Sequence, residues 1–193
     1  MIKDHFTLFQ AHIYTTDKTD YKLKSIQEIV KLIDDEYEAR RKPGNLAYQR
    51  MENQVMTVTA SSNKYCSRSS AGRETALWHV TDGIIESPFP DLNEQCFSDS
   101  TPNQVPDWIE LNFHNPVSAG KVVVYPKKNS LRDYEVQVSN DGKEWTTVGK
   151  VENATDAAQV VSFNRQLLKC IRIFVTKTNG PNTLISEIEV YEK

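Results

Sequence analysis

The sequence predicts an all-β fold, an antiparallel β-sandwich of the jelly-roll type, with an α-helical segment at its N-terminus. From about residue 54 onward, short apolar segments alternate with turn residues. In several of them apolar and polar side chains alternate, as expected for strands with one face in a core and the other in water. The candidate strands lie near residues 55–60, 75–81, 107–113, 119–126, 132–139, 144–150, 157–163, 168–177 and 184–192.

The best-marked element is a hairpin centred on residues 140–143. Its sequence, Asn140-Asp141-Gly142-Lys143, favours a tight turn because Asn, Asp and Gly tolerate positive φ. Trp145 then restarts the apolar face on the return strand. The apolar phases of the strands place seven side chains in the core: Trp108, Val123, Tyr134, Val136, Ile171, Ile173 and Ile188.

Residues 1–52 differ in kind from the rest. Apolar residues recur there at helical spacing between charged ones, at Leu23, Ile26, Val30, Ile33 and Tyr37. Pro43 and Gly44 end this helix, and the basic triplet Arg40-Arg41-Lys42 is interpreted as a solvated cap at its C-terminus. We expect residues 1–52 to be a linker or the end of a preceding domain, and residues 53–193 to form the β-domain. The apolar stripe needs a partner, either the β-domain or a larger domain outside this chain.

Length and composition limit the functions to consider. The 193 residues suffice for one full core. A net charge of -3, from 23 basic and 26 acidic residues, gives no basic surface of the kind that nucleic-acid-binding proteins carry. No segment approaches the ~18 apolar residues of a membrane span, and the N-terminus lacks the apolar core of a signal peptide. We therefore expect neither nucleic acid nor a membrane span.

The sequence contains no catalytic signature. His-Glu-x-x-His, Gly-x-Ser-x-Gly, a phosphate loop and Cys-x-x-Cys are all missing, and the four histidines are scattered. We therefore expect this chain not to be an enzyme.

Of the three cysteines, Cys170 lies in an apolar strand and is expected to be a buried thiol. Cys66 and Cys96 lie in predicted loops, where they either form one disulfide in an oxidising compartment or stay reduced.

Four phrases follow one another in the second half of the chain: DWIELNFHNPV, VVVYPKKNSLRDYEVQVSNDGKEWTTVG, KCIRIFVT and ISEIEVYEK. Together with an upstream strand at residues 58–62 and the Asp-Gly turn at residues 80–83, this ordered series resembles the discoidin family. That family is also called the coagulation factor 5/8 type C domain and includes galactose-binding carbohydrate modules. The resemblance covers about residues 53–193. One departure is an insertion, Ile84–Gln95, after which Phe97-Ser98 takes the place of the family's Trp-x-Ser.

The resemblance implies a structural calcium ion between the Asp-Gly turn and the last strand. Asp82 and Glu187 match its two carboxylate positions, and hard cations require several oxygen ligands. Where the family often has an amide side chain, this chain has Ile84, which can ligate only through its carbonyl. The alternative interpretation is a turn-capping Asp and a solvent-facing Glu.

The resemblance also implies a sugar site, with an aromatic platform, an arginine and an asparagine in loops at one end of the sandwich. The place of the arginine falls at Lys127 and that of the asparagine at Asn129. Because lysine lacks the planar fork of arginine, the sugar specificity is expected to differ from that of galactose binders. Phe89 is the candidate platform and His79 a polar neighbour. Two further aromatic residues are more simply interpreted as core, Trp78 and Phe97.

These expectations combine into one functional hypothesis. The chain is a non-catalytic carbohydrate-binding module for a glycan whose sugar the sequence does not identify. It is then the C-terminal part of a larger secreted or surface glycan-degrading protein, in contact with an absent catalytic domain, and works outside the cell, at its surface or in the periplasm. The alternative is a structural or protein-interaction domain without a sugar site, since one fold serves many functions.

Overall fold

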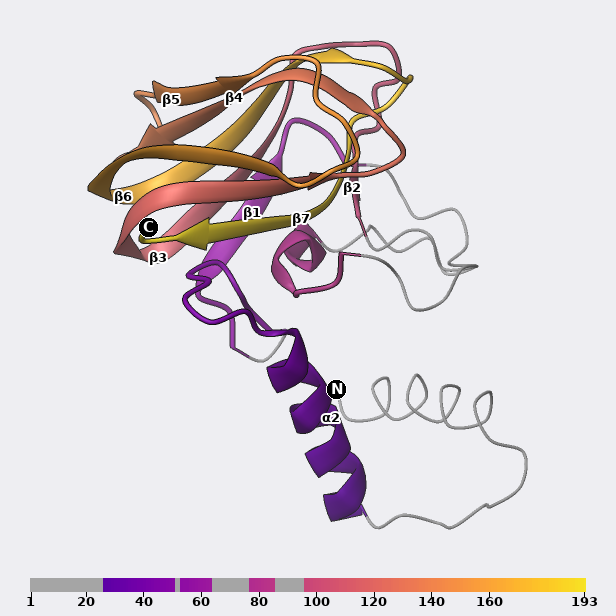
Figure 1. Cartoon of the computed structure of the whole chain (residues 1–193), viewed down its shortest axis with the longest axis vertical. Helices are drawn as coiled ribbons and strands as arrows, with labels where there is room; N and C mark the ends of the chain where they lie inside the picture. The colour runs from indigo at the N-terminus through magenta and orange to yellow at the C-terminus, as the bar shows by residue number, and fades with distance from the viewer. Residues whose placement is uncertain (1–25, 51–52, 64–76, 86–95) are drawn as a thin grey trace. The chain divides into compact units, whose positions relative to one another are not determined.

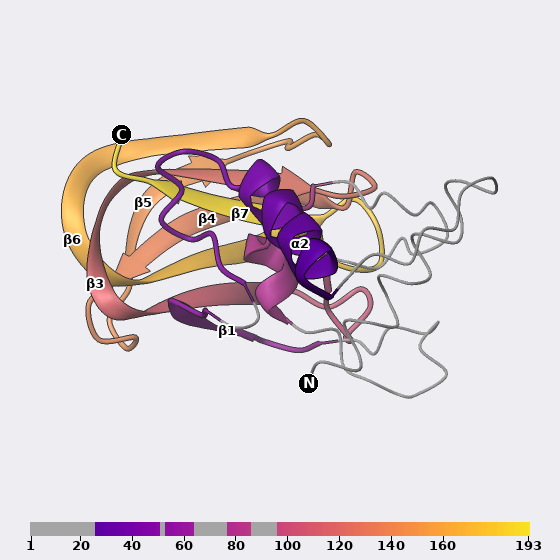
Figure 2. The same ribbon diagram turned by 90° about the horizontal axis from the view of Figure 1, so that it is seen from below.

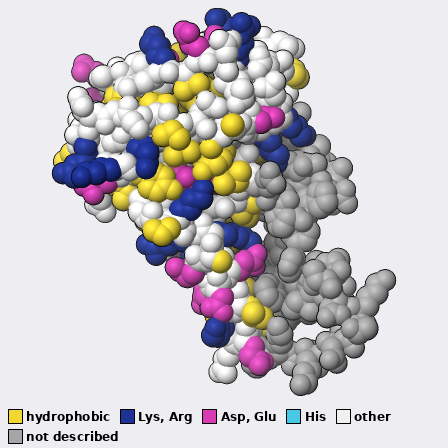
Figure 3. All heavy atoms as spheres, in the orientation of Figure 1, with side chains coloured by type: hydrophobic (Ala, Val, Ile, Leu, Met, Phe, Trp, Pro, Cys, Tyr) yellow, Lys and Arg dark blue, Asp and Glu magenta, His cyan; other side chains and the backbone are white. Residues whose placement is uncertain are grey.

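A computed structural model describes residues 26–50, 53–63, 77–85 and 96–193. The chain divides into two compact units, Met1–Glu38 and Ala39–Lys193. The predicted helix is confirmed as α2 (Ile26–Arg40). Among its described side chains, the partly buried stripe runs through Ile29, Ile33 and Tyr37, whereas Val30, which we predicted for this stripe, is 51% exposed. Figure 3 shows mostly acidic and basic side chains along α2.

The predicted antiparallel β fold is confirmed in the second unit. Every strand pair is antiparallel. The strands, shown in Figure 1, are β1 (Met56–Ala60), β2 (Phe97–Ser98), β3 (Asp107–Pro126), β4 (Leu131–Ser139), β5 (Thr146–Val151), β6 (Gln159–Thr178) and β7 (Leu184–Tyr191).

Two layers arise because β3 and β6 are long and bent, as Figures 1 and 2 show. They pair with each other on both sides of two register shifts, which lie between Asn112 and Val117 and between Ala119 and Lys121 of β3. The first half of β3 and the second half of β6 form one layer with β1, β4 and β5. The other halves form the second layer with β7 and β2. Each of these long strands had been predicted as two, because the sequence marks the bulges as breaks.

The core lies between the two layers. Six of the seven predicted core side chains are buried. Among them, Tyr134, Val136, Ile171 and Ile173 are at most 1% exposed. Trp108 is the exception and the prediction was wrong. It is partly exposed because its neighbour Ile109, 0% exposed, takes the inward phase of β3.

The predicted strand at residues 75–81 was also wrong. Its described part is a 3-10 helix, η1 (Leu77–Thr81). The Thr81 hydroxyl donates to the Trp78 carbonyl at 2.8 Å and so closes the turn locally instead of pairing with a sheet. The Asp82-Gly83 turn follows, with a φ of 82° at Gly83, where a Cβ would lie 2.8 Å from the Arg40 carbonyl oxygen. Only glycine fits that position without strain.

Residues just after α2 pack along the edge of β7. The Leu46 amide donates to the Val190 carbonyl at 2.7 Å, and the Val190 amide donates to Asn45 Oδ1 at 3.0 Å. The Gln49 amide donates to the Thr81 carbonyl at 3.0 Å. This segment therefore satisfies edge groups of β7 that would otherwise be open to another chain.

Lys42 belongs to the same segment and is not the solvated cap that the sequence suggested. Its Nζ lies 2.5 Å from Glu189 Oε1 and 2.7 Å from the Tyr125 hydroxyl. Burial by itself lowers the pKa of Lys42, but the bonds to Glu189 and Tyr125 outweigh it, and the pKa is raised. Glu189, only 3% exposed, therefore has a cation bound beside it.

Other local predictions are confirmed. The hairpin at residues 140–143 joins β4 to β5, with a φ of 71° at Gly142 and the Lys143 amide donating to Asp141 Oδ1 at 2.8 Å. Phe97 and Cys170 are buried.

No helix in the described part of the chain is long and apolar enough to span a membrane.

Truncating the core at β6 should destabilise the domain. Ile173→Ala removes a side chain that is 1% exposed and should lower the free energy of unfolding by about 2 to 5 kcal/mol, through lost burial and a residual cavity. Val160→Ala on the same strand, where the side chain is 60% exposed, should change it by less than about 0.5 kcal/mol. Urea unfolding followed by circular dichroism measures both, and equal losses in the two variants would contradict this core.

Candidate functional site

The turn between β3 and β4 carries the two residues predicted for sugar binding, Lys127 and Asn129. Its backbone is fixed by a bond from the Ser130 amide to the Lys127 carbonyl and by another from the Lys127 amide to the Leu184 carbonyl, both 3.1 Å. Lys128 and Asn129 have φ values of 54° and 48°. Asn adopts this left-handed conformation more readily than most residues, so it suits the position for a backbone reason as well.

Asn179, in the loop between β6 and β7, ties that turn to its neighbour. Its Nδ2 lies 3.4 Å from Asn129 Oδ1 and donates to the Leu131 carbonyl at 3.1 Å. Its backbone amide donates to the Ser130 carbonyl at 2.8 Å. The β3–β4 turn and the β6–β7 loop therefore form one continuous surface, and the Asn129 side chain is held in place from one side.

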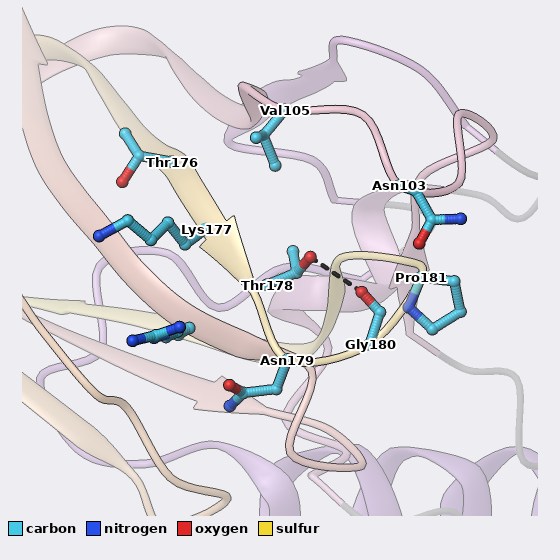
Figure 4. A pocket seen from close by; sticks show the side chains of 9 residues that line it. Asn103, Val105, Thr176, Lys177, Thr178, Asn179, Gly180 and Pro181 are labelled. Atoms are coloured by element: carbon cyan, nitrogen blue, oxygen red, sulfur yellow. Dashed lines mark hydrogen bonds between the residues drawn. The ribbon is translucent and has the colours of Figure 1, made fainter.

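An open hollow of about 550 Å³ lies beside Asn179. This volume is within the range of about 300 to 1,000 Å³ that is usual for small-ligand sites. Figure 4 shows Thr176 and Lys177 of β6 on one side and Asn103 and Pro181 on the other. The hollow is lined by Asn103, Val105, Arg132, Thr176, Lys177, Thr178, Asn179, Gly180 and Pro181.

Two buried aspartates hold one wall of the hollow. Asp99, 0% exposed, accepts from the Thr183 amide at 2.6 Å and from the Thr101 amide at 2.9 Å. Asp107 accepts from the Thr183 hydroxyl at 2.7 Å, and burial raises the pKa of its carboxyl. The Asn103 amide donates to the Pro181 carbonyl at 2.7 Å. The 99–107 loop is thus attached to the β6–β7 loop by hydrogen bonds of two buried carboxylates and by one backbone bond.

Asp82 and Glu187, the predicted cation ligands, are both buried, at 2% and 0% exposed. The Gly83 amide donates to Glu187 Oε1 at 3.1 Å, which brings the Asp-Gly turn against the last strand. Glu187 Oε2 is buried without a hydrogen-bond partner in the described part of the chain. Asp82 bonds His79 Nδ1 at 2.8 Å and the Ile84 amide at 2.9 Å. The interpretation of Glu187 as a solvent-facing residue was wrong.

The charge of Glu187 is costly where it lies. Burial, and then the negative charge of Asp82, raise the pKa of Glu187 well above its usual value. A buried carboxylate oxygen with no donor, next to a second carboxylate, suits a hard cation. The described residues hold no group of three or more Asp, Glu, His or Cys side chains that could bind a metal. The resemblance implies that the further ligands are backbone carbonyls and a hydroxyl or amide oxygen.

The remaining predicted residues are distributed as follows. His79 bonds the Asp82 carboxylate. Trp78 is partly exposed, and its ring stacks on the His79 ring with centroids 4.1 Å apart. Phe89 and Cys66 lie outside the described residues, so neither the platform nor the disulfide with Cys96 is tested.

Sequence reasoning missed Asn103, Arg132, Lys177 and Asn179, which line the hollow. The signal was the run Asn179-Gly180-Pro181-Asn182, a cluster of turn-forming residues between two strands. It marks a loop, but not the loops that this one meets in the folded chain.

A model of the F5/8 type C domain family matches residues 57–190. The chain belongs to this family. Comparison with curated protein sequences gives no match.

Solved structures with the same fold include carbohydrate-binding modules. One is chitosan-binding module 1 of a chitosanase/glucanase from Paenibacillus sp. IK-5, with 25% identity and a TM-score of 0.58, covering 76% of this chain and 98% of that chain. CpGH89CBM32-5 from Clostridium perfringens, in complex with GalNAc-β-1,3-galactose, has 18% identity and a TM-score of 0.57, covering 71% and 95%. A Streptococcus pneumoniae fucose binding module has 18% identity and a TM-score of 0.60, covering 79% and 99%.

The raised pKa of Glu187 determines how the free energy of unfolding of metal-free protein changes with pH. The unfolded chain releases this proton near pH 4.5, whereas the folded chain retains it to higher pH. The free energy of unfolding should therefore fall as pH rises from about 4.5 toward the folded pKa. Glu187→Gln should remove that fall and be the more stable form at neutral pH.

Urea unfolding over a pH series with a chelator measures this effect. Glu192→Gln is the control, because its side chain is 54% exposed. Parallel pH profiles for wild type and Glu187→Gln would contradict the burial of an unpaired carboxylate.

Proposed function

We propose that this chain is a non-catalytic carbohydrate-binding module whose site lies at the end of the sandwich formed by the β3–β4 turn and the β6–β7 loop. The observation that carries the proposal is the open hollow lined by amides and charged groups, directly joined to Asn129 through Asn179. The family and its carbohydrate-binding neighbours support it. The site offers hydrogen-bond donors and acceptors at fixed positions, which is what sugar hydroxyls require.

Asn129 and Lys127 have distinct roles in this proposal. The exposed Asn129 presents an oriented amide whose position Asn179 fixes. Lys127 supplies a single-point cationic donor in place of a bidentate arginine. Because a sugar offers few strong contacts, we expect dissociation constants of roughly 0.1 to 1 mM. Phe89 is the proposed aromatic platform, whereas His79, bonded to Asp82, is assigned to the cation cluster.

We further propose that Asp82 and Glu187 hold a structural calcium ion. The unpartnered Glu187 Oε2 supports this, since a cation would neutralise the repulsion between the two carboxylates. Such an ion would fasten the Asp-Gly turn to β7 and so support the fold. It has no chemical role in this proposal.

A module of this kind serves a larger protein. We propose that it is the C-terminal part of a secreted or surface glycan-degrading protein, and that it raises the effective concentration of its catalytic domain at the substrate. In this proposal the module works outside the cell, at its surface or in the periplasm.

Asn129→Asp tests the sugar site. It keeps the left-handed backbone preference and one acceptor oxygen but removes the amide donor, so sugar affinity should fall about tenfold, the equivalent of about 1.4 kcal/mol. Asn153→Asp is the matched control, because Asn153 also has positive φ, at 54°. Titration by nuclear magnetic resonance with galactose, fucose, chitotriose and GalNAc-β-1,3-galactose measures the affinities. Peak shifts confined to other surfaces, or none, would leave the interaction-domain alternative as the better one.

Calcium addition tests the cation cluster. Binding to the folded state alone should stabilise metal-free protein by about 2.7 kcal/mol at a concentration a hundred times the dissociation constant. The melting temperature of wild type should rise with calcium and return with chelator, whereas that of Glu187→Gln should not change. Glu192→Gln should behave as wild type. Superimposable wild-type melting curves, from protein verified as metal-free, would rule out an exchangeable calcium site here.

A further inference from the structure

The outer face of the β1–β3–β6–β4–β5 layer carries aromatic side chains that the proposed end site does not use. Trp108 of β3 and Phe174 of β6 are partners in register and both partly exposed. They point away from the core because Ile109 and Ile173, next to them in sequence, are buried. A tryptophan half-open to water on a sheet face leaves apolar area uncovered.

Arg172 joins a third ring to this pair. Its guanidinium carbon lies 4.0 Å from the centre of the Trp145 ring and 5.3 Å from that of Phe174. Its Nε and Nη2 both donate to Gln137 Oε1, at 2.9 and 2.6 Å. Gln137 therefore fixes a guanidinium that contacts both rings, and Trp108 adjoins Phe174 across the strand pair, so these four side chains lie next to one another.

The charges on this outer face compensate one another. Lys150 Nζ lies 2.6 Å from Glu135 Oε1, and Glu110 is the register partner of Arg172. Lys150 holds the pKa of Glu135 down at about 2, so the pair stays ionised at neutral pH. The face therefore offers rings and hydrogen-bonding groups without net charge. It has no excess of cations for a phosphate chain, whereas a neutral chain of sugar rings matches it.

The outer face is continuous with the hollow at the end of the sandwich. Thr176 lines the hollow, and Phe174 and Arg172 precede it by two and four residues on β6. Alternate residues of a strand share a face, and four residues span about 14 Å. Asp133 of β4 and Lys177 of β6, bridged at 2.7 Å, lie at the border between the hollow and the face. The stretch of β6 from Arg172 to Thr176 is therefore longer than one sugar ring.

We propose that the end site and the outer face form one extended binding track for a neutral oligosaccharide or polysaccharide chain. The terminal unit or an internal unit lies in the hollow, and the following units stack along β6 over Phe174, Trp108 and Trp145. This inference rests on the proposed function of the end site and goes beyond it, because it assigns the ligand class as a chain rather than a single sugar. Arg172 is a positioning residue, because its guanidinium contacts both the Trp145 ring and the Phe174 ring.

Chain-length dependence of affinity tests the track. The probes are neutral β-1,4-linked N-acetylglucosamine and galactose oligomers, from monosaccharide to hexasaccharide, measured by isothermal titration calorimetry on the full chain. Affinity should rise at least tenfold between monosaccharide and hexasaccharide. Trp145→Ala should remove most of that rise while leaving monosaccharide affinity unchanged. Asn129→Asp should weaken every length.

Leu167→Ala, at an exposed apolar residue of β6 in the other layer, is the matched control and should change neither affinity. If Trp145→Ala lowers the melting temperature, the indole resonances of wild type decide instead. Those of Trp108 and Trp145 should shift with hexasaccharide and not with monosaccharide. Equal affinity for all lengths, with monosaccharide still bound, overturns the track alone. No binding of any probe by wild type overturns the proposed function, and the track with it.

Discussion

The antiparallel pairing of β3 with β6 is the constraint on which the rest of the domain depends. The two strands are partners from Asp107 to Val124 and from Gln159 to Val175, on either side of the bulges. All other pairings attach to this pair: β1 and β7 to β3, β4 to β6, and β5 and β2 one strand further out. Because the pair bends, its two halves face each other and enclose the core, so one pair of long strands contributes to both layers.

The same bend also determines which loops meet at the end of the sandwich. It leaves the ends of β3, β4, β6 and β7 at one edge, where the Lys127–Ser130 turn meets the 179–184 loop. Buried Asp99 and Asp107 fix that edge through neutral donors, at the cost of keeping two carboxylates away from water. The proposed binding site, which consists of loops, therefore has walls held by hydrogen bonds, and this lowers the entropy lost when a ligand binds.

The two buried carboxylates of β7, Glu187 and Glu189, both need a compensating positive charge, and they differ in how it is supplied. Glu189 is neutralised by Lys42 and accepts hydrogen bonds from the hydroxyls of Tyr125 and Tyr191. Glu187, two residues earlier, receives one backbone amide, and its other oxygen has no hydrogen-bond partner among the described residues. An internal lysine thus neutralises Glu189, and the proposed cation would neutralise Glu187. Lys42 and the Gly83 amide connect β7 to segments that precede β1 and β2 in sequence.

The sequence alone predicted the fold class and most strand positions, because alternation and turn chemistry are local properties. The pairing of Asp82 with Glu187 was implied by the family resemblance, and in the fold the Gly83 amide beside Asp82 bonds Glu187. Only the tertiary structure decided three matters. It merged predicted strands across bulges, turned Trp108 outward, and placed Asn179 against Asn129 although they are 50 residues apart. Such contacts depend on how the layers close over one another, which no local pattern encodes. The direction of a side chain at a strand end likewise depends on which neighbour the core accepts, here Ile109 rather than the larger Trp108.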